Sequence, residues 1–227
     1  MRVVSYNIRS LRDDRQAVAR VLRSVDADVV CIQEAPRFLF WRRSCRRLAD
    51  AAGLLIVGGG RSAAANLLLA KPSIEVRGAR DVLFSKDRGL HQRGVAMVQL
   101  RWNGRAVAIA GTHLDGVEEP RLRHIAELHD TIKEFVPAGV PVALAGDVNT
   151  QPGSRSWEAL CAGGRDAFAV AGRGDGMTAT PKQPTRRIDA MFVSDGLSVL
   201  SCTALDTPDV LRASDHRPVV VDIELPG

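Results

Sequence analysis

The sequence predicts an α/β domain with mixed β-sheets. Short apolar runs of strand length alternate with segments in which apolar residues recur at helical spacing. The dipeptide Asn103-Gly104 joins two apolar runs, residues 95–102 and 105–110, and Asn-Gly in this setting is a strong hairpin signal. At least part of the sheet is therefore expected to be antiparallel, which argues against a purely parallel doubly wound fold. The pattern alone leaves open whether there is one sheet or two.

Length and composition favour one domain over residues 1–227. The chain has 227 residues, of which 45% are hydrophobic, enough for one sizeable core and short for two. The four cysteines show no C-x-x-C spacing, which suits reduced thiols, and no apolar run reaches the roughly 18 residues of a membrane span. The N-terminus opens on a strand pattern without an apolar signal core. We expect a cytoplasmic monomer with no membrane insertion.

The charge balance favours an anionic partner without identifying one. Lys and Arg total 31 against 26 Asp and Glu, a formal net charge of +5. A solvated basic surface accounts for this modest excess equally well.

Helical spacing predicts four helices. The first covers residues 14–25, with Asp13 or Asp14 as its cap, and the second covers residues 38–53 and ends at Gly53. In the second helix we expect Phe38 and Trp41 to face inward. Its outward face would carry Arg42, Arg43, Arg46 and Arg47. The other two helices are expected at residues 122–135 and 157–161.

Strands are expected at the remaining apolar runs, and one long loop separates two of them. The further strand runs are residues 3–6, 29–32, 54–57, 66–70, 74–76, 142–145, 188–194, 197–205 and 219–225. Residues 171–187 are rich in glycine and polar residues and predict a loop, long enough to cover or bind a ligand.

The stretch PVALAGDVNT, residues 141–150, carries the first sign of chemistry. Residues 142–145 predict a buried strand, and Gly146 removes side-chain bulk where another group approaches the backbone closely. Asp147 and Asn149 lie two apart and would point the same way on an extended segment. They offer a proton acceptor beside an amide that can orient it. Alone, this pattern is equally that of a strand followed by an Asx turn.

Polar residues recur at one end of six apolar runs. Six unrelated caps or buried polar groups are a poor explanation for this recurrence, because charged residues beside core strands are rarely buried without a partner. These residues are Asn7, Glu34, His113, Asp147 with Asn149, Asp189, and Asp215 with His216. Carboxylate and amide oxygens suit Mg²⁺ or Mn²⁺ better than zinc. A hard divalent ion, two imidazoles and a carboxylate base are the parts needed to hydrolyse a phosphoester.

The ordered motifs SYNIR, IQE, GTHLD, GDVNT, RIDAMFVS and SDHRPV, found between Val3 and Val221, resemble those of the endonuclease/exonuclease/phosphatase superfamily. This group includes deoxyribonuclease I and the exonuclease III type of AP endonuclease. The resemblance implies two mixed, largely antiparallel β-sheets packed as a sandwich and flanked by helices, in four α/β/β/α layers. It also implies phosphoester hydrolysis that depends on Mg²⁺ or Mn²⁺.

The resemblance assigns metal and substrate roles by position. Glu34 would be the principal metal ligand, Asn7 would hold metal or phosphate beside it, and Asp215 would hold the metal side or pair with a histidine. Arg9 and Arg93 would face the substrate. An arginine at position 9 resembles the deoxyribonuclease I pattern, whereas AP endonucleases usually carry an acidic residue there, which argues against AP endonuclease activity.

The resemblance also assigns catalytic roles. Asp147 would activate the attacking water, and Asn149 would orient that water or the phosphate. His113 would contact the scissile phosphate, and Asp189 would orient that histidine or its neighbours. His216 would stabilise the pentacovalent phosphate or share the role of base. Which carboxylate is the general base stays open.

Three readings of function follow from these residues. The leading one is a metal-dependent phosphodiesterase or nuclease acting on DNA or RNA, and its variant is a phosphatase or phosphodiesterase of a small phosphorylated metabolite or lipid headgroup. The second is a catalytically silent module that holds a phosphate-bearing partner. The third is a structural domain whose polar strand ends are only caps and turns, which six concordant motifs make the weakest of the three.

Overall fold

The computed structural model describes residues 1–225 and contains two β-sheets packed face to face. The first sheet has seven strands in the order β10-β12-β13-β1-β2-β4-β3. Its strands are β1 (Arg2–Asn7), β2 (Val29–Gln33), β3 (Leu55–Gly60), β4 (Asn66–Ala70), β10 (Gly172–Arg173), β12 (Ser198–Ala204) and β13 (Val219–Glu224).

The second sheet has six strands in the order β5-β6-β7-β8-β11-β9. Its strands are β5 (Glu75–Leu83), β6 (Gly94–Trp102), β7 (Arg105–His113), β8 (Val142–Asp147), β9 (Arg165–Asp166) and β11 (Asp189–Val193). β6 and β7 form the antiparallel hairpin expected around Asn103-Gly104. Both sheets are mixed and mainly antiparallel, which confirms the predicted fold class.

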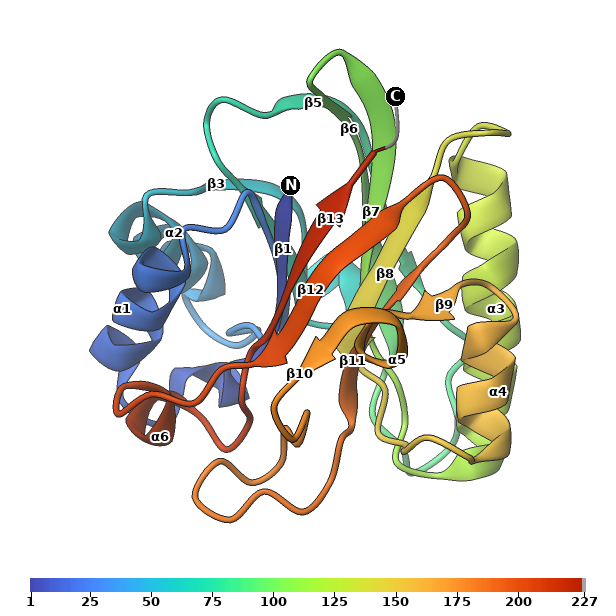
Figure 1. The fold of residues 1–227 in the computed structure, drawn as a ribbon. Coiled ribbons are helices and arrows are strands. Elements are labelled where there is room, and N and C mark those ends of the chain that lie inside the picture. The colour runs from blue at the N-terminus through green and yellow to red at the C-terminus, as the bar shows by residue number, and fades with distance from the viewer. Residues whose placement is uncertain (226–227) are drawn as a thin grey trace.

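Helices cover the two outer faces of the sandwich (Figure 1). The helices are α1 (Arg15–Val25), α2 (Trp41–Ala52), α3 (Glu118–Phe135), α4 (Arg155–Cys161), α5 (Ala167–Ala171) and α6 (Val210–Ala213), with 3₁₀ turns at Arg9–Leu11 and Arg61–Ala63. α1, α2 and α6 lie against the first sheet, and α3 and α4 lie against the second. None of these helices is both long and apolar enough to span a membrane.

Strand alternation divides the apolar residues among three cores. Neighbouring residues of a strand face opposite sides of the sheet, so Val3 packs between the sheets while Val4 packs beneath the helices of the first sheet. On the other sheet, Val98 faces the space between the sheets and Met97 faces α3 and α4. The four-layer arrangement thus follows directly from period-two patterning in buried strands.

Helix α1 begins where the sequence indicates. Asp14 is its N-cap, and its carboxylate accepts hydrogen bonds from the backbone N–H groups of Gln16 and Ala17 at 2.9 and 3.0 Å. Such caps satisfy backbone donors that the first turn leaves without partners.

Helix α2 begins later than expected, which corrects the prediction for residue 38. The helix runs from Trp41, and Phe40 before it has a left-handed backbone with φ of 59°. Trp41 anchors the first turn because its ring lies over Gly60, where a Cβ would come within 2.6 Å of the ring. Phe38 therefore lies beyond the anchored turn and is exposed, not buried.

Five other elements differ from expectation. β5 extends from Glu75 to Leu83 because its backbone pairs along its length with β6, although its side chains are mostly exposed and give little apolar signal. The sequence does not predict the short elements β9, α5, β10 and α6, since each has five residues or fewer and too little sequence to show a period.

The strand directions bring the polar residues of the six motifs to one edge of the sandwich. β1 is parallel to β2 and β7 is parallel to β8, so the residues that end these strands lie together. β11 is antiparallel to β8 and β13 is antiparallel to β1, so polar residues at the start of β11 and before β13 reach the same edge. The register places Asp147 opposite both His113 and Asp189.

Candidate active site

A polar cleft of about 330 Å³ lies at this edge. Its lining includes these residues predicted from the sequence: Glu34, Arg93, His113, Asp147, Asn149 and His216. They come from both sheets and from the loops that follow them. The structure therefore brings together most of the candidate catalytic residues, as the recurrence of polar strand ends predicts.

Asp147 lies at the centre of this group. Its Oδ2 accepts a 3.0 Å hydrogen bond from Asn7 Nδ2, lies 3.3 Å from His113 Nε2 and lies 3.8 Å from His216 Nε2. Burial raises the pKa of the Asp147 carboxyl, and the neighbouring histidines and the Asn7 hydrogen bond act against that rise. Its Oδ1 accepts from the backbone N–H of Asn149 at 3.1 Å, so the Asx turn is present and holds the carboxylate in place.

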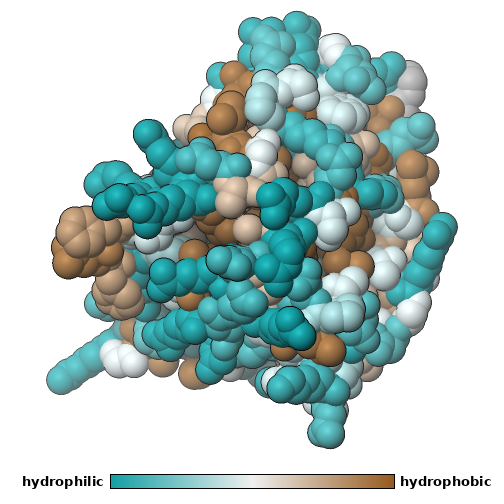
Figure 2. Space-filling model, turned by 90° about the vertical axis from the view of Figure 1, so that its left-hand side faces the viewer, coloured by the Kyte–Doolittle hydropathy of each residue, from teal (hydrophilic) through white to brown (hydrophobic). Residues whose placement is uncertain are grey.

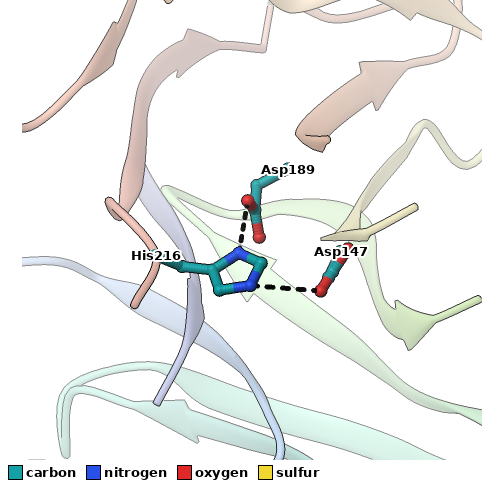
Figure 3. A group of neighbouring side chains, drawn as sticks. All are labelled: Asp147, Asp189 and His216. Carbon is teal, nitrogen blue, oxygen red and sulfur yellow. Dashed lines mark hydrogen bonds and ion pairs between the residues drawn. The ribbon is translucent and has the colours of Figure 1, made fainter. Parts of the chain in front are cut away.

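His216 lies between two buried carboxylates (Figure 3). Its Nδ1 is 2.8 Å from Asp189 Oδ2, and its Nε2 faces Asp147. Burial alone would lower the pKa of His216. The charge and hydrogen bond of Asp189, with the charge of Asp147, outweigh burial and raise this pKa to about 10. His216 is thus a cationic imidazole that can donate a proton or a hydrogen bond.

His113 has the opposite electrostatic character. Burial lowers its pKa to about 3, so the ring is neutral despite the nearby charge of Asp147. Its Nε2 lies 3.1 Å from Asn149 Nδ2, which also donates to the carbonyl of Leu114 at 3.0 Å. Asp189, which was expected to orient His113 or its neighbours, contacts His216, whereas His113 lies beside Asp147 and Asn149. The two histidines are therefore suited to different tasks.

The site holds several oxygen donors that could bind a divalent cation: the carboxylates of Asp147 and Asp189 offer atoms that lie, with a nitrogen of His216, within 4.8 Å of one another, and Glu34 lines the same cleft. Glu34 has a left-handed backbone with φ of 51°, and its Oε1 accepts from Asn7 Nδ2 at 3.3 Å. Asn7 Nδ2 thus lies between the carboxylates of Glu34 and Asp147. Its N–H groups donate to both and reduce the repulsion between the two negative charges. Asp189 Oδ1 is buried and accepts no hydrogen bond from residues 1–225. This donor set, rich in carboxylate oxygens and with one buried oxygen left over, fits Mg²⁺ or Mn²⁺.

Glu34 would hold such an ion directly. Asn7 would join it through Oδ1, which now accepts from the backbone N–H of Arg9 at 3.0 Å, so its amide would have to rotate. The ion would neutralise charge on the phosphate oxygens and the leaving group.

Asp215 and Arg9 pair with each other at the rim of the site. Arg9 Nε lies 3.4 Å from Asp215 Oδ2, and Arg9 also contacts Asp13. Asp215 is half-buried, and its other contact is with the hydroxyl of Ser214, at 3.4 Å. Metal binding by Asp215 and substrate binding by Arg9 stay predictions. Arg93 is mainly buried, lines the cleft and lies 3.6 Å from Asp115, so its cationic group is held at the site.

Several lining residues escaped the sequence analysis. They are Ser10, Arg12, Arg37, Phe38, Ala64, Ala65 and His91. Ser10 lies within a left-handed turn over Arg9–Leu11, and Arg12 directly follows it; the turn contains no glycine that would have indicated it. Phe38 begins the expected second helix and Arg37 directly precedes it, and His91 could have been found because it lies two residues before Arg93.

Two hydroxyl groups form hydrogen bonds with the backbone of candidate site residues Asn7 and Asp189. Ser214 Oγ donates to the backbone carbonyl of Asn7 at 2.7 Å, which ties the segment before β13 to the end of β1. Thr178 Oγ1 accepts from the backbone N–H of Asp189 at 3.2 Å, which ties the long loop to the start of β11. Ser214 opens the motif SDHRPV, whereas Thr178 lies in the predicted loop and belongs to none of the six motifs.

The fold and the site together define an α/β sandwich with a carboxylate and histidine cleft at the strand ends. Residues 4–216 match the endonuclease/exonuclease/phosphatase family, and the chain belongs to that family. It therefore has the fold of a phosphoesterase family that depends on a divalent metal. No curated protein matches the chain.

Solved structures with similar folds come from several organisms. An endonuclease/exonuclease/phosphatase protein from Bacteroides vulgatus is 22% identical, with 99% of this chain and 98% of that chain covered and a TM-score of 0.83. A mannosyl-6-phosphatase from Bacteroides thetaiotaomicron is 18% identical, with 99% of each chain covered and a TM-score of 0.84. TDP2 of D. rerio, solved with a single-strand DNA product, is 18% identical, with 99% and 98% covered and a TM-score of 0.76. At these identities the likeness shows the fold alone.

Proposed function

We propose that the chain is a Mg²⁺- or Mn²⁺-dependent phosphodiesterase, with DNA or RNA as the first substrate to test. The observation that carries the proposal is the position of the Asp147 carboxylate, which faces His113, His216 and the Asn7 amide within one cleft. A general base, a cationic donor and a carboxylate metal ligand are then within reach of one phosphate. These are the groups that phosphoester hydrolysis requires.

Each residue has a task that follows from its electrostatics. Asp147 takes a proton from the attacking water, because burial raises the pKa of its carboxyl and makes it a stronger base than an exposed aspartate. Asn149 orients the water or the phosphate. His216, kept cationic by Asp189, donates to the phosphoryl oxygens as negative charge develops. Neutral His113 contributes a hydrogen bond to the scissile phosphate and would not repel a cation that Glu34 would hold.

Nucleic acid is supported by the positive groups around the cleft. Arg12, Arg37 and Arg93 line it and would face an anionic backbone. The D. rerio structure of similar fold was solved with single-strand DNA. A small phosphorylated metabolite or a lipid headgroup is the second candidate, favoured by the cleft volume of about 330 Å³, which suits a small ligand, and by the mannosyl-6-phosphatase of similar fold.

One panel of assays tests the proposal. Hydrolysis of single-stranded DNA, duplex DNA, RNA, bis(nitrophenyl) phosphate, nitrophenyl phosphate and mannose 6-phosphate would be measured with Mg²⁺, Mn²⁺, Zn²⁺ or EDTA. We expect cleavage of diesters with Mg²⁺ or Mn²⁺ and none in EDTA. Preference for the monoesters would select the second candidate. Binding of phosphate compounds without turnover of any would instead indicate a silent binding module, and full activity in EDTA would overturn the metal requirement.

The proposed setting is the cytoplasm, with the protein as a monomer. The four cysteines, Cys31, Cys45, Cys161 and Cys202, are free thiols. Burial raises the pKa of the Cys31 thiol to about 12, so this group is an inert part of the core. Reduced thiols of this kind support a reducing compartment.

A further inference from the structure

Three consecutive apolar side chains project beside the cleft. Phe38, Leu39 and Phe40, here called the apolar tip, are 70%, 83% and 71% exposed. Figure 2 shows hydrophobic side chains projecting at one edge of a mainly hydrophilic face. Isolated exposed apolar residues are ordinary, but a continuous group of this kind marks an interaction site.

Two surface hollows, both lined mainly by apolar atoms, lie next to the apolar tip. One, of about 570 Å³, is lined by the tip, Trp41, Arg37 and Arg61. The other, of about 490 Å³, lies between α2 and β3, and its lining includes Trp41, Ile56 and Leu67 with Arg42, Arg43 and Arg46. β3 is the edge strand of the first sheet. The apolar surface thus extends from the loop before α2 to the edge of that sheet.

Guanidinium groups border this surface. Arg42, Arg43, Arg46 and Arg47 are exposed and form no ion pair with any residue that the structure describes, whereas exposed Arg80 and Arg123 each pair with a carboxylate. The Arg42 guanidinium lies 4.6 Å from the centre of the Trp41 ring, and that of Arg37 lies 5.5 Å from the centre of the Phe38 ring. The positive charges are therefore available beside the apolar groups.

We propose that the apolar tip and the arginines of α2 dock on an anionic phospholipid surface. The tip enters the boundary between headgroups and acyl chains, and the arginines bind lipid phosphates, as in other interfacial segments with an apolar and a basic face. Phe38 and Phe40 carry rings that can stack on nucleobases, but Leu39, the most exposed of the three, is aliphatic and offers none, whereas all three side chains can enter the boundary of the acyl chains. This observation favours lipid over nucleic acid as the partner.

Docking would bring the catalytic cleft to the lipid surface. Arg37 and Phe38 line both the hollow at the tip and the catalytic cleft. The proposed contact with lipid is confined to this loop and the arginines of α2, and no described helix is able to span a membrane. Lipid docking is measured without catalysis, so it stands or falls separately from the proposed phosphodiesterase activity.

Vesicle co-sedimentation tests the apolar contribution. The protein is expected to bind vesicles of phosphatidylcholine with phosphatidylglycerol more tightly than phosphatidylcholine alone. The double variant Leu39→Ser, Phe40→Ser should bind about 10²-fold more weakly, because two large apolar side chains no longer leave water. The matched control is the double variant Leu83→Ser, Leu200→Ser. These two leucines are 50% and 54% exposed and lie outside the apolar tip, so the control should bind like the unmodified protein.

Charge variants test the arginines. Arg43→Gln, Arg46→Gln should weaken binding to the anionic vesicles about 25-fold, from about fivefold for each lost charge. The control Arg101→Gln, Arg105→Gln removes two exposed charges from the β6–β7 hairpin and should have little effect. Binding should fall between 0.1 and 1 M salt, because salt screens exposed charges.

Three results would overturn the proposal. One is no binding of the unmodified protein to anionic vesicles, and another is equal loss in the control variants. The third is tight binding of a single-stranded DNA 20-mer that depends on Leu39 and Phe40, together with no binding to vesicles. That result would assign the surface to nucleic acid. Unchanged turnover of bis(nitrophenyl) phosphate, or an unchanged melting temperature, would show that Leu39→Ser, Phe40→Ser leaves the fold intact.

Discussion

Asn7 and Asp147, 140 residues apart in the chain, meet through a 3.0 Å hydrogen bond in which the amide donates to the carboxylate. Asn7 ends β1 of the first sheet, and Asp147 ends β8 of the second. The same amide group donates to Glu34 at 3.3 Å. One neutral side chain thus joins the two sheets and separates two carboxylates.

Asn7→Ala should weaken metal binding more than it weakens the fold. Without the amide, Glu34 and Asp147 lose a shared donor and their orientation. The metal concentration for half-maximal activity should rise about 10- to 100-fold, the usual scale for losing a group that orients metal ligands. Activity measured against Mg²⁺ and Mn²⁺ concentration checks this. An unchanged metal requirement would restrict Asn7 to a structural role.

Asp147→Asn and His216→Ala should each lower kcat by roughly 10²-fold or more with little change in melting temperature. The first removes the proposed base and the second removes the cationic donor, each worth this scale in catalysis. Steady-state kinetics and thermal unfolding would be measured on the same preparations. Loss of activity only in proportion to loss of folded protein would contradict the catalytic roles.

Gly146→Ala should lower the free energy of unfolding by at least about 2 kcal/mol, the scale of overpacking in a rigid core. A Cβ at residue 146 would lie 2.1 Å from the backbone carbonyl oxygen of Thr112, in the neighbouring strand β7. Denaturant unfolding measures the change. Gly116→Ala is the control, because nothing lies within 4 Å of its Cβ, and it should leave stability unchanged within about 1 kcal/mol.

The Arg2–Asp222 pair should make part of the stability depend on pH. Arg2 donates to Asp222 at 2.8 and 3.1 Å, and this hydrogen bonding lowers the pKa of the Asp222 carboxyl below its ordinary value of 3.8. Because the folded pKa is depressed, the stabilisation is present above pH 3.8 and is lost as the pH falls through the folded pKa. The melting temperature of Asp222→Asn should therefore lie furthest below that of the unmodified protein near neutral pH. The difference between the two melting temperatures should disappear in acid.

The placement of the site could be predicted from the sequence because it depends on strand direction. Polar residues follow the apolar runs that became β1, β2, β7 and β8, and they open or precede those that became β11 and β13. The structure makes the last two antiparallel to their neighbours, which puts all six groups at one edge. Gly146 was likewise assigned to a close backbone approach, and the Thr112 carbonyl is the group that approaches.

The pairing of side chains could not be predicted, because it depends on side-chain positions within the folded site. Asp189 could have faced either histidine, and the structure pairs it with His216. The outward position of Phe38 also escaped prediction. Helical spacing alone would have continued α2 back to residue 38, whereas the packing of Trp41 on Gly60 fixes the first turn. Long-range contacts of this kind have no local pattern.

The division of the site between two sheets links catalysis to how the sheets are stacked. Asn7 moves with the first sheet and Asp147 moves with the second, so a slip of one sheet over the other by about 1 Å would break their contact, and misplacement on that scale can cost about 10²-fold in rate. Each sheet could keep its own hydrogen-bonded ladder during such a slip. We therefore expect that the site could be disrupted without unfolding, because the offset between the two sheets would decide whether the groups proposed to act together stay in contact.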